Sequence, residues 1–207
     1  MLYNERSANP GARIVPRVVD IEERRAAFVD ASWRVIAEEG LRAASLRRVA
    51  TAAGCTTGAL THYFPDRQAL LVAALCAVNE RAGRRMFAIA ERVTDPVDRL
   101  RRVLHEALPL DDASLQEWRV WLAFWSECMH DVALAEESER RYAEWEAGLR
   151  GLVAAVAPAD RISAEVAEWI VLVDGLGLGI ARHGADGAGL EPARVQAREI
   201  IETRLRR

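Results

Sequence analysis

Few side chains in this sequence have the spacing that catalysis or metal binding requires. His105 and Glu106 begin like the HExxH zinc motif, but Pro109 stands where the second histidine must be. All 28 basic residues are arginine, which excludes a Walker A phosphate loop and Schiff-base chemistry, since both need lysine. The three cysteines form no CxxC pair, which favours a reducing cytoplasm over a disulfide scaffold. We therefore expect a cytoplasmic protein with no catalytic residue, no metal site and no cofactor.

A short basic segment, by contrast, has the chemistry of a DNA-binding element. The chain as a whole is acidic, with 31 carboxylates against 28 arginines, yet residues 41–70 contain four arginines and only one aspartate. Thr56, Thr57 and Gly58 occur together in this segment, where small residues at a helix start allow backbone amides and hydroxyls to approach a phosphate. This pattern indicates contact with nucleic acid. The alternative interpretation is a solvated, turn-rich surface.

Helices must position these residues. Apolar side chains recur at helical spacing almost throughout, and no segment shows the alternation typical of a strand. Ser45, Thr56 or Thr57, Asp66 and Ser163 have the side chains of good N-caps. The pattern predicts an all-α protein with about nine helices, at residues 18–39, 46–53, 57–63, 67–93, 96–108, 112–129, 132–156, 164–183 and 192–206.

The two short helices, joined by a turn around Gly54, have the length of a helix-turn-helix. Their sequence resembles the DNA-binding domain of the TetR family of transcriptional regulators. A capped helix ends in AxxAG and is followed by TTGALxHYF and then DRxxLL. The resemblance covers about residues 18–81, and its matching positions include Gly58, Leu60, Tyr63, Phe64, Leu70 and Leu71.

This resemblance implies a homodimer that binds a palindromic operator in double-stranded DNA, with its two recognition helices in successive major grooves. It also implies a DNA-binding domain at 18–81 and an effector-binding and dimerisation domain at 82–207. Residues 1–17 contain Pro10, Gly11 and Pro16 and show no helical periodicity, which predicts a mobile arm. Arg67 would hold a phosphate of the DNA backbone. The residues implied to contact DNA are Ser45, Arg47, Thr56, Thr57, Gly58, Thr61, His62, Tyr63 and Arg67.

The second part contains an aromatic stripe and an isolated acid. Trp118, Trp121 and Trp125 follow one another at i, i+3 and i+7, on one face of a helix. Asp174 is a lone carboxylate in a long apolar run. One interpretation is an aromatic cage with a counter-charge for a cationic ligand. The other, which these residues alone favour, is core packing, with Asp174 paired to an arginine.

The runs WLAFWxxxMH and LVDGLxL, at residues 121–130 and 172–178, resemble the BetI-type regulators within the TetR family. Those proteins repress choline-to-betaine genes and respond to choline. The resemblance implies a choline-like or other cationic small-molecule effector. The implied ligand-binding residues are Trp121, Trp125, Met129 and Asp174.

The last two helices are candidates for the dimer interface. The helix at 164–183 is apolar nearly all round, and the core of one domain can rarely bury a helix on every side.

The longest strictly apolar run, residues 69–78, is too short to span a membrane. We therefore expect a repressor that a small molecule releases from DNA. The alternative is an all-α small-molecule-binding or enzymatic module with a tryptophan-lined cavity and no specific DNA role.

Overall fold

The computed structural model describes residues 21–183 and 187–206, and within these ranges it contains helices and no strand. The predicted all-α fold is thus confirmed. The predicted arm at 1–17 and the predicted helix start at 18 lie outside the described residues. The helices are α1 (Ile21–Glu39), the short 3-10 helix η1 (Leu41–Ala43), α2 (Leu46–Ala52), α3 (Thr57–Thr61), α4 (Arg67–Arg92), α5 (Pro96–Glu106), α6 (Asp112–Cys128), α7 (Val132–Val153), α8 (Ile162–Ala181) and α9 (Leu190–Leu205).

Side chains at the helix starts determine where several of these helices begin. Ser45, Thr56 and Asp66 each accept a hydrogen bond from the backbone N–H group three residues on, at 3.2, 3.2 and 2.8 Å. These three predicted caps are confirmed. The cap predicted at Ser163 is wrong. Helix α8 begins one residue earlier, and the Ser163 hydroxyl instead accepts a hydrogen bond from Arg150 of α7 at 3.1 Å.

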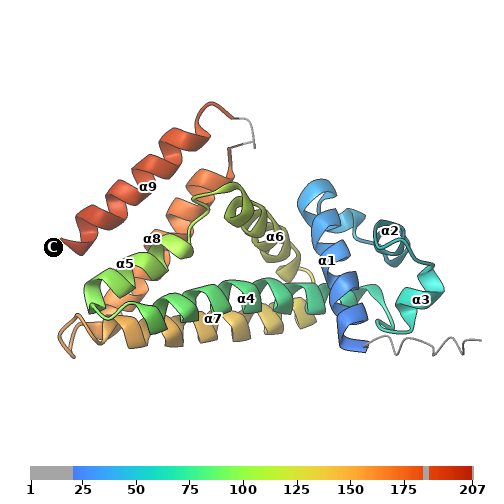
Figure 1. Cartoon of the computed structure of the whole chain (residues 1–207), viewed down its shortest axis with the longest axis horizontal. Coiled ribbons are helices and arrows are strands. Elements are labelled where there is room, and N and C mark those ends of the chain that lie inside the picture. The colour runs from blue at the N-terminus through green and yellow to red at the C-terminus, as the bar shows by residue number, and fades with distance from the viewer. Residues whose placement is uncertain (1–20, 184–186, 207) are drawn as a thin grey trace, which may run out of the picture.

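One long helix runs through both parts of the molecule. Helices α1, α2 and α3 gather at one end, and α5, α8 and α9 lie at the other (Figure 1). Helix α4, with 26 residues, begins beside α3 and continues alongside α7 toward α5. The boundary predicted at residue 81 falls within α4, so the two parts share one continuous helix. None of the described helices combines the length and the apolar character that a membrane crossing requires.

Two hydrophobic cores form on either side of α6. Val120 and Phe124 of α6 are fully buried in the first core, together with apolar residues of α1 to α4. Trp118, from the same helix, belongs to the second core with residues of α5, α7, α8 and α9. Because protein interiors are close-packed, a displacement of α6 in one core has to be accommodated in the other.

Candidate DNA-binding surface and effector cavity

The turn between α2 and α3 presents the predicted recognition helix to solvent. Gly54 adopts a φ of 68°, in the left-handed region that glycine enters without steric cost. It thereby ends α2 and allows Thr56 to cap α3. Seven of the nine residues predicted to contact DNA are exposed, namely Ser45, Arg47, Thr56, Thr57, Gly58, Thr61 and His62.

The capping hydroxyls keep a proton that they can donate in a hydrogen bond. Ser45 and Thr56 use their oxygen atoms to accept hydrogen bonds from the backbone at the starts of α2 and α3. A hydroxyl that accepts in this way still has its own proton to donate. Both groups therefore remain able to donate to a phosphate oxygen, whereas Thr61 donates to the Gly58 carbonyl at 3.1 Å.

The two predicted arginine contacts differ in their surroundings. Arg47 is exposed, and its guanidinium pairs with none of the residues that the structure describes. Arg67 is half-buried, and it donates to the carbonyl oxygens of Leu41 at 2.7 Å and Ala44 at 3.1 Å. Arg67 thus holds the η1–α2 connection against α4. Its predicted contact with a phosphate remains a prediction, and only its remaining N–H groups are available for it.

Tyr63 is half-buried and contributes to packing. Its ring meets the ring of Phe28 edge to face, with centroids 5.2 Å apart, and its carbonyl accepts a hydrogen bond from Arg25 at 3.1 Å. Tyr63 therefore joins the end of α3 to α1. His62, beside it, stays exposed on the predicted DNA side of the helix.

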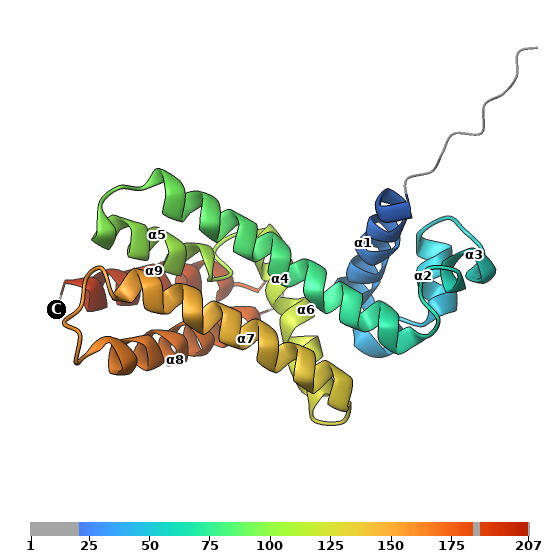
Figure 2. The same ribbon diagram turned by 90° about the horizontal axis from the view of Figure 1, so that it is seen from below.

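A cavity of about 590 Å³ lies among α4, α5, α6, α7 and α8. Helices α4 and α7 form two of its sides and run alongside each other in the same direction (Figure 2). Four tryptophans line it: Trp118, Trp121 and Trp125 from α6, and Trp145 from α7. The predicted aromatic stripe thus faces this cavity.

The tryptophan rings are arranged around one another. Trp118 and Trp125 meet edge to face, with centroids 6.0 Å apart, and Trp121 and Trp125 are tilted by 46° at 6.3 Å. The Trp118 Nε1 donates to the Ala107 carbonyl at 2.9 Å, which fixes that ring. Met129 does not line this cavity. Its side chain is 74% exposed, because α6 ends at the preceding residue.

Asp174 lines the same cavity, and its partner is not an arginine. The hydroxyl of Tyr142 donates a hydrogen bond to its carboxylate, and no described cation pairs with it. Burial raises the pKa of Asp174, and the hydrogen bond from Tyr142 only partly offsets that effect. The alternative of an Asp174–arginine pair is thereby wrong for the described residues. Tyr142 and Trp145 were not singled out from the sequence, although their i, i+3 spacing places both on one face of α7.

Glu117, a buried acid at this cavity, already has its counter-charge. Arg85 of α4 donates to both carboxylate oxygens of Glu117, at 2.8 and 2.5 Å, and to Glu106 at 2.5 Å. Glu117 is only 8% exposed, and this ion pair offsets part of the cost of burying its charge. Asp174 thus differs from Glu117 in having no described cation beside it.

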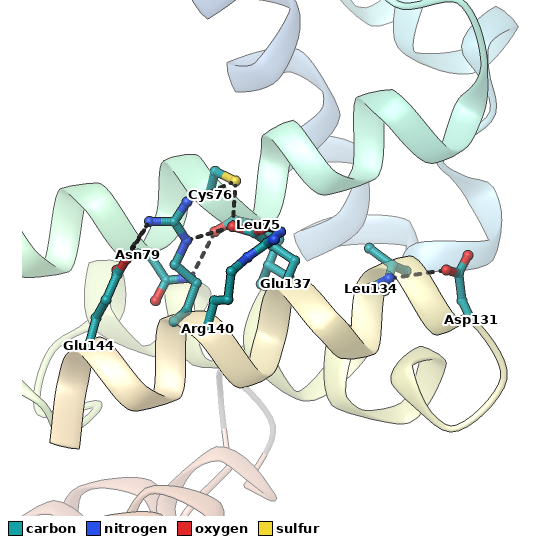
Figure 3. Close-up of polar contacts among 9 residues, drawn as sticks. Leu75, Cys76, Asn79, Asp131, Leu134, Glu137, Arg140 and Glu144 are labelled. Carbon is teal, nitrogen blue, oxygen red and sulfur yellow. Dashed lines mark hydrogen bonds and ion pairs between the residues drawn. The ribbon is translucent and has the colours of Figure 1, made fainter.

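A polar cluster ties α4 to α7 next to the cavity (Figure 3). Glu137 is 3% exposed and accepts hydrogen bonds from Cys76 at 2.9 Å, from Arg141 at 2.6 Å, and from Arg140. Burial raises the pKa of Glu137, but the hydrogen bonds from Cys76 and the two arginines outweigh it and bring the pKa to about 2. The Glu137 charge is thus satisfied within the protein.

Comparison with protein families agrees with this architecture. Residues 28–74 match the family of bacterial regulatory proteins called the tetR family. Residues 96–206 match the C-terminal domain of BetI-type transcriptional repressors.

Two individual transcriptional regulators are similar in sequence to this chain over most of its length. The HTH-type transcriptional regulator PksA of Bacillus subtilis is 33% identical over 192 residues, which are 90% of this chain and 88% of that protein. The regulator BetI of Burkholderia ambifaria is 32% identical over 166 residues, which are 79% of this chain and 85% of that protein.

Solved structures share the fold. A transcriptional regulator from Rhodococcus sp. has a TM-score of 0.77 and 26% identity, over 87% of this chain and 95% of that one. A regulator from Saccharomonospora viridis, solved in complex with choline, has a TM-score of 0.76 and 23% identity, over 87% of this chain and 96% of that one. This chain therefore belongs to the TetR family of transcriptional regulators, with a C-terminal domain of the BetI type, and it is not an enzyme.

Proposed function

We propose that this regulator is a homodimeric repressor that leaves its operator when a small cationic effector enters the tryptophan-lined cavity. The observation that carries this proposal is the environment of Asp174. Its carboxylate lies at the cavity, its pKa is raised by burial, and its described partner is the neutral hydroxyl of Tyr142. A buried carboxylate without a counter-charge is costly, and a bound cation would supply the missing charge.

The neighbouring rings favour the same class of ligand. Trp121 and Trp125 both line the cavity beside each other, and a desolvated cation over a tryptophan face gains about 2 kcal/mol. The related regulator from Saccharomonospora viridis binds choline, which makes choline the first compound to test. Trp121, Trp125 and Asp174 are the proposed ligand-binding residues, while the exposed position of Met129 gives it no part in this cavity.

The operator would be bound through α2 and α3. The exposed Arg47 and the exposed small residues at the start of α3 support contact with phosphates and base edges in the cytoplasm. A single short recognition helix has a small footprint, so we propose a dimer on a palindromic site, with half-sites roughly 34 Å apart or a multiple of it. Exposed apolar side chains on the last two helices support that dimer: Val171 at 72% and Leu178 at 52% on α8, and Val195 at 52% on α9.

The test measures operator binding and ligand binding on the full chain. Operator DNA selected from a random pool is labelled, and its release is followed by fluorescence anisotropy while choline, betaine or tetramethylammonium is added. The matched control ligand is 3,3-dimethyl-1-butanol, which has the shape of choline without its charge. We expect release by a cation and a much weaker response to the alcohol. Equal release by the uncharged alcohol, or no release by any cation, would contradict the proposal.

A variant separates operator binding from the response to the effector. Trp125→Ala is expected to abolish release while operator affinity stays unchanged, because Trp125 lies in the second part of the chain, outside the helix-turn-helix. Loss of operator binding in the same variant would indicate that Trp125 acts through folding rather than through the ligand.

A further inference from the structure

The cavity is longer than a choline molecule requires. Its lining residues on α4 extend from Asn79 to Ala90, and those on α7 extend from Arg141 to Leu152. Each span rises about 16 Å at the helical repeat, and the two helices run side by side in the same direction (Figure 2). The volume of about 590 Å³ lies in the range of sites for drug-sized ligands, whereas choline is a trimethylammonium group with only a hydroxyethyl tail.

Polarity differs between the two ends of this cavity. Tyr142 lies at the start of the α7 span and binds Asp174, so the uncompensated carboxylate is at that end. The other end is formed by the apolar side chains of Phe87, Ala90 and Leu152. A ligand that fills both ends needs a charge at one end and an apolar body at the other.

The exposure of Phe87 is a second indication that the ligand has an apolar part. Its side chain is 65% exposed although it is a large apolar residue at the edge of the cavity. An apolar chain passing between α4 and α7 would cover that ring and remove its surface from water, which is favourable in proportion to the buried area.

We infer that the effector is an amphiphilic cation, with its cationic head between Asp174 and the rings of Trp121 and Trp125 and with an apolar chain that reaches Phe87. This inference rests on the proposed function, because it takes Asp174 as the counter-charge. It adds a preference for cations with a longer apolar tail than choline has.

The test is a series of alkyltrimethylammonium ions, from tetramethyl through butyl and hexyl to octyl, used below their micelle concentrations. Isothermal titration calorimetry on the full chain gives Kd for each ion. We expect Kd to fall about fourfold for each added methylene, until the chain fills the apolar end. A Kd that stays constant or rises as the chain lengthens would overturn the inference.

A matched pair of variants tests where the alkyl chain of the ligand lies. Gly148 lines the far half of the cavity, and a Cβ at this position meets nothing within 4 Å. Gly148→Leu should fill that space and remove the gain from the longer chains, while the affinity for tetramethylammonium stays unchanged. Gly151→Leu is the control, because Gly151 is exposed on the same helix, as Gly148 is, but does not line the cavity. An unchanged chain-length series in Gly148→Leu would overturn the assigned path.

One further ligand, 1-octanol, and one variant, Asp174→Asn, distinguish failure of this inference from failure of the proposed function. If tetramethylammonium binds, and Asp174→Asn weakens it, but longer chains add nothing, then only the amphiphile inference fails. If 1-octanol binds as tightly as octyltrimethylammonium and tetramethylammonium does not bind, the cation itself is unnecessary. In that case the proposed function fails together with the inference.

Discussion

The indole of Trp118 occupies the space in which a side chain at Gly177 would begin. A Cβ on Gly177 would lie 2.0 Å from Cη2 of that ring, closer than any two such atoms can approach. Trp118 is 8% exposed and comes from α6, and Gly177 is buried in α8. The missing side chain therefore lets α6 and α8 pack closely, and it determines where one wall of the cavity stands.

Gly177→Ala should lower the stability of the protein. Overpacking a core costs about 1–3 kcal/mol, while replacing glycine by alanine inside a helix returns about 1 kcal/mol. We expect a net loss of about 1 kcal/mol in the free energy of unfolding, measured by urea denaturation. Gly179→Ala is the control, because a Cβ there meets nothing within 4 Å, and it should raise stability. Equal effects of the two substitutions would contradict the close contact with Trp118.

Asp174→Asn should stabilise the ligand-free protein and weaken its binding of cations. Burial raises the pKa of Asp174, so the ionised carboxylate is a cost that the amide avoids, and the amide oxygen can still accept from Tyr142. A hydrogen bond or contact to a charged group contributes about 1.5–3 kcal/mol, so choline affinity should fall at least about tenfold. The melting temperature and calorimetric Kd are measured on the same samples. Lower stability with unchanged affinity would assign Asp174 a purely structural role.

Cation affinity should increase with pH while the contribution of Asp174 to stability decreases. The pKa of Asp174 is higher in the folded protein than its ordinary value of about 3.9, so the unfolded chain releases this proton first. The free energy of unfolding therefore falls as pH rises from the ordinary value through the raised one. Over the same window the carboxylate becomes charged and binds choline more tightly. Calorimetry across this window should show the trend in the wild type and not in Asp174→Asn; a shared trend would assign it to another group.

Arg47 and Arg67 should separate DNA contact from folding. Arg47→Ala is expected to leave stability unchanged, to weaken specific and random DNA equally, and to reduce the slope of log affinity against log salt by about one. Arg67→Ala should also destabilise the domain by about 1.5–3 kcal/mol, because its bonds to the Leu41 and Ala44 carbonyls are lost. If the salt slope of Arg67→Ala equals that of the wild type, Arg67 supports the fold and makes no phosphate contact.

The exposed apolar face of α8 should be the dimer interface. Leu178→Glu places a charge where a partner helix would pack, and we expect monomers by sedimentation velocity and a large loss of operator affinity. Val132→Glu is the control, because Val132 is 75% exposed at the start of α7, on a different helix. A dimer that persists in Leu178→Glu and dissociates in Val132→Glu would place the interface elsewhere.

Local signals made the helix-turn-helix predictable. Ser45, Thr56 and Gly54 determine helix ends through contacts within a few residues, and such contacts can be read directly from the sequence. The prediction for Met129 came from the resemblance of the run at 121–130 to BetI-type regulators. Since α6 ends at Cys128, that side chain leaves the stripe and points into solvent.

The contacts between side chains that line the cavity could not be predicted in the same way. Tyr142 and Asp174 are far apart in the chain, and only the packing of α7 against α8 brings the hydroxyl to the carboxylate. The family resemblance implies a phosphate contact for Arg67, yet the carbonyl groups that Arg67 binds in the structure belong to residues 23 and 26 positions away. Periodicity identifies the face of a helix, and tertiary packing decides what that face meets.

The membership of α6 in both cores has a thermodynamic consequence. If an effector in the cavity weakens operator binding by a given factor, operator DNA must weaken effector binding by the same factor, because binding linkage is reciprocal. Under the proposed function, protein that is free in the cell would then bind the effector before protein on the operator does. The effector concentration needed for release would therefore depend on how much of this protein the cell contains.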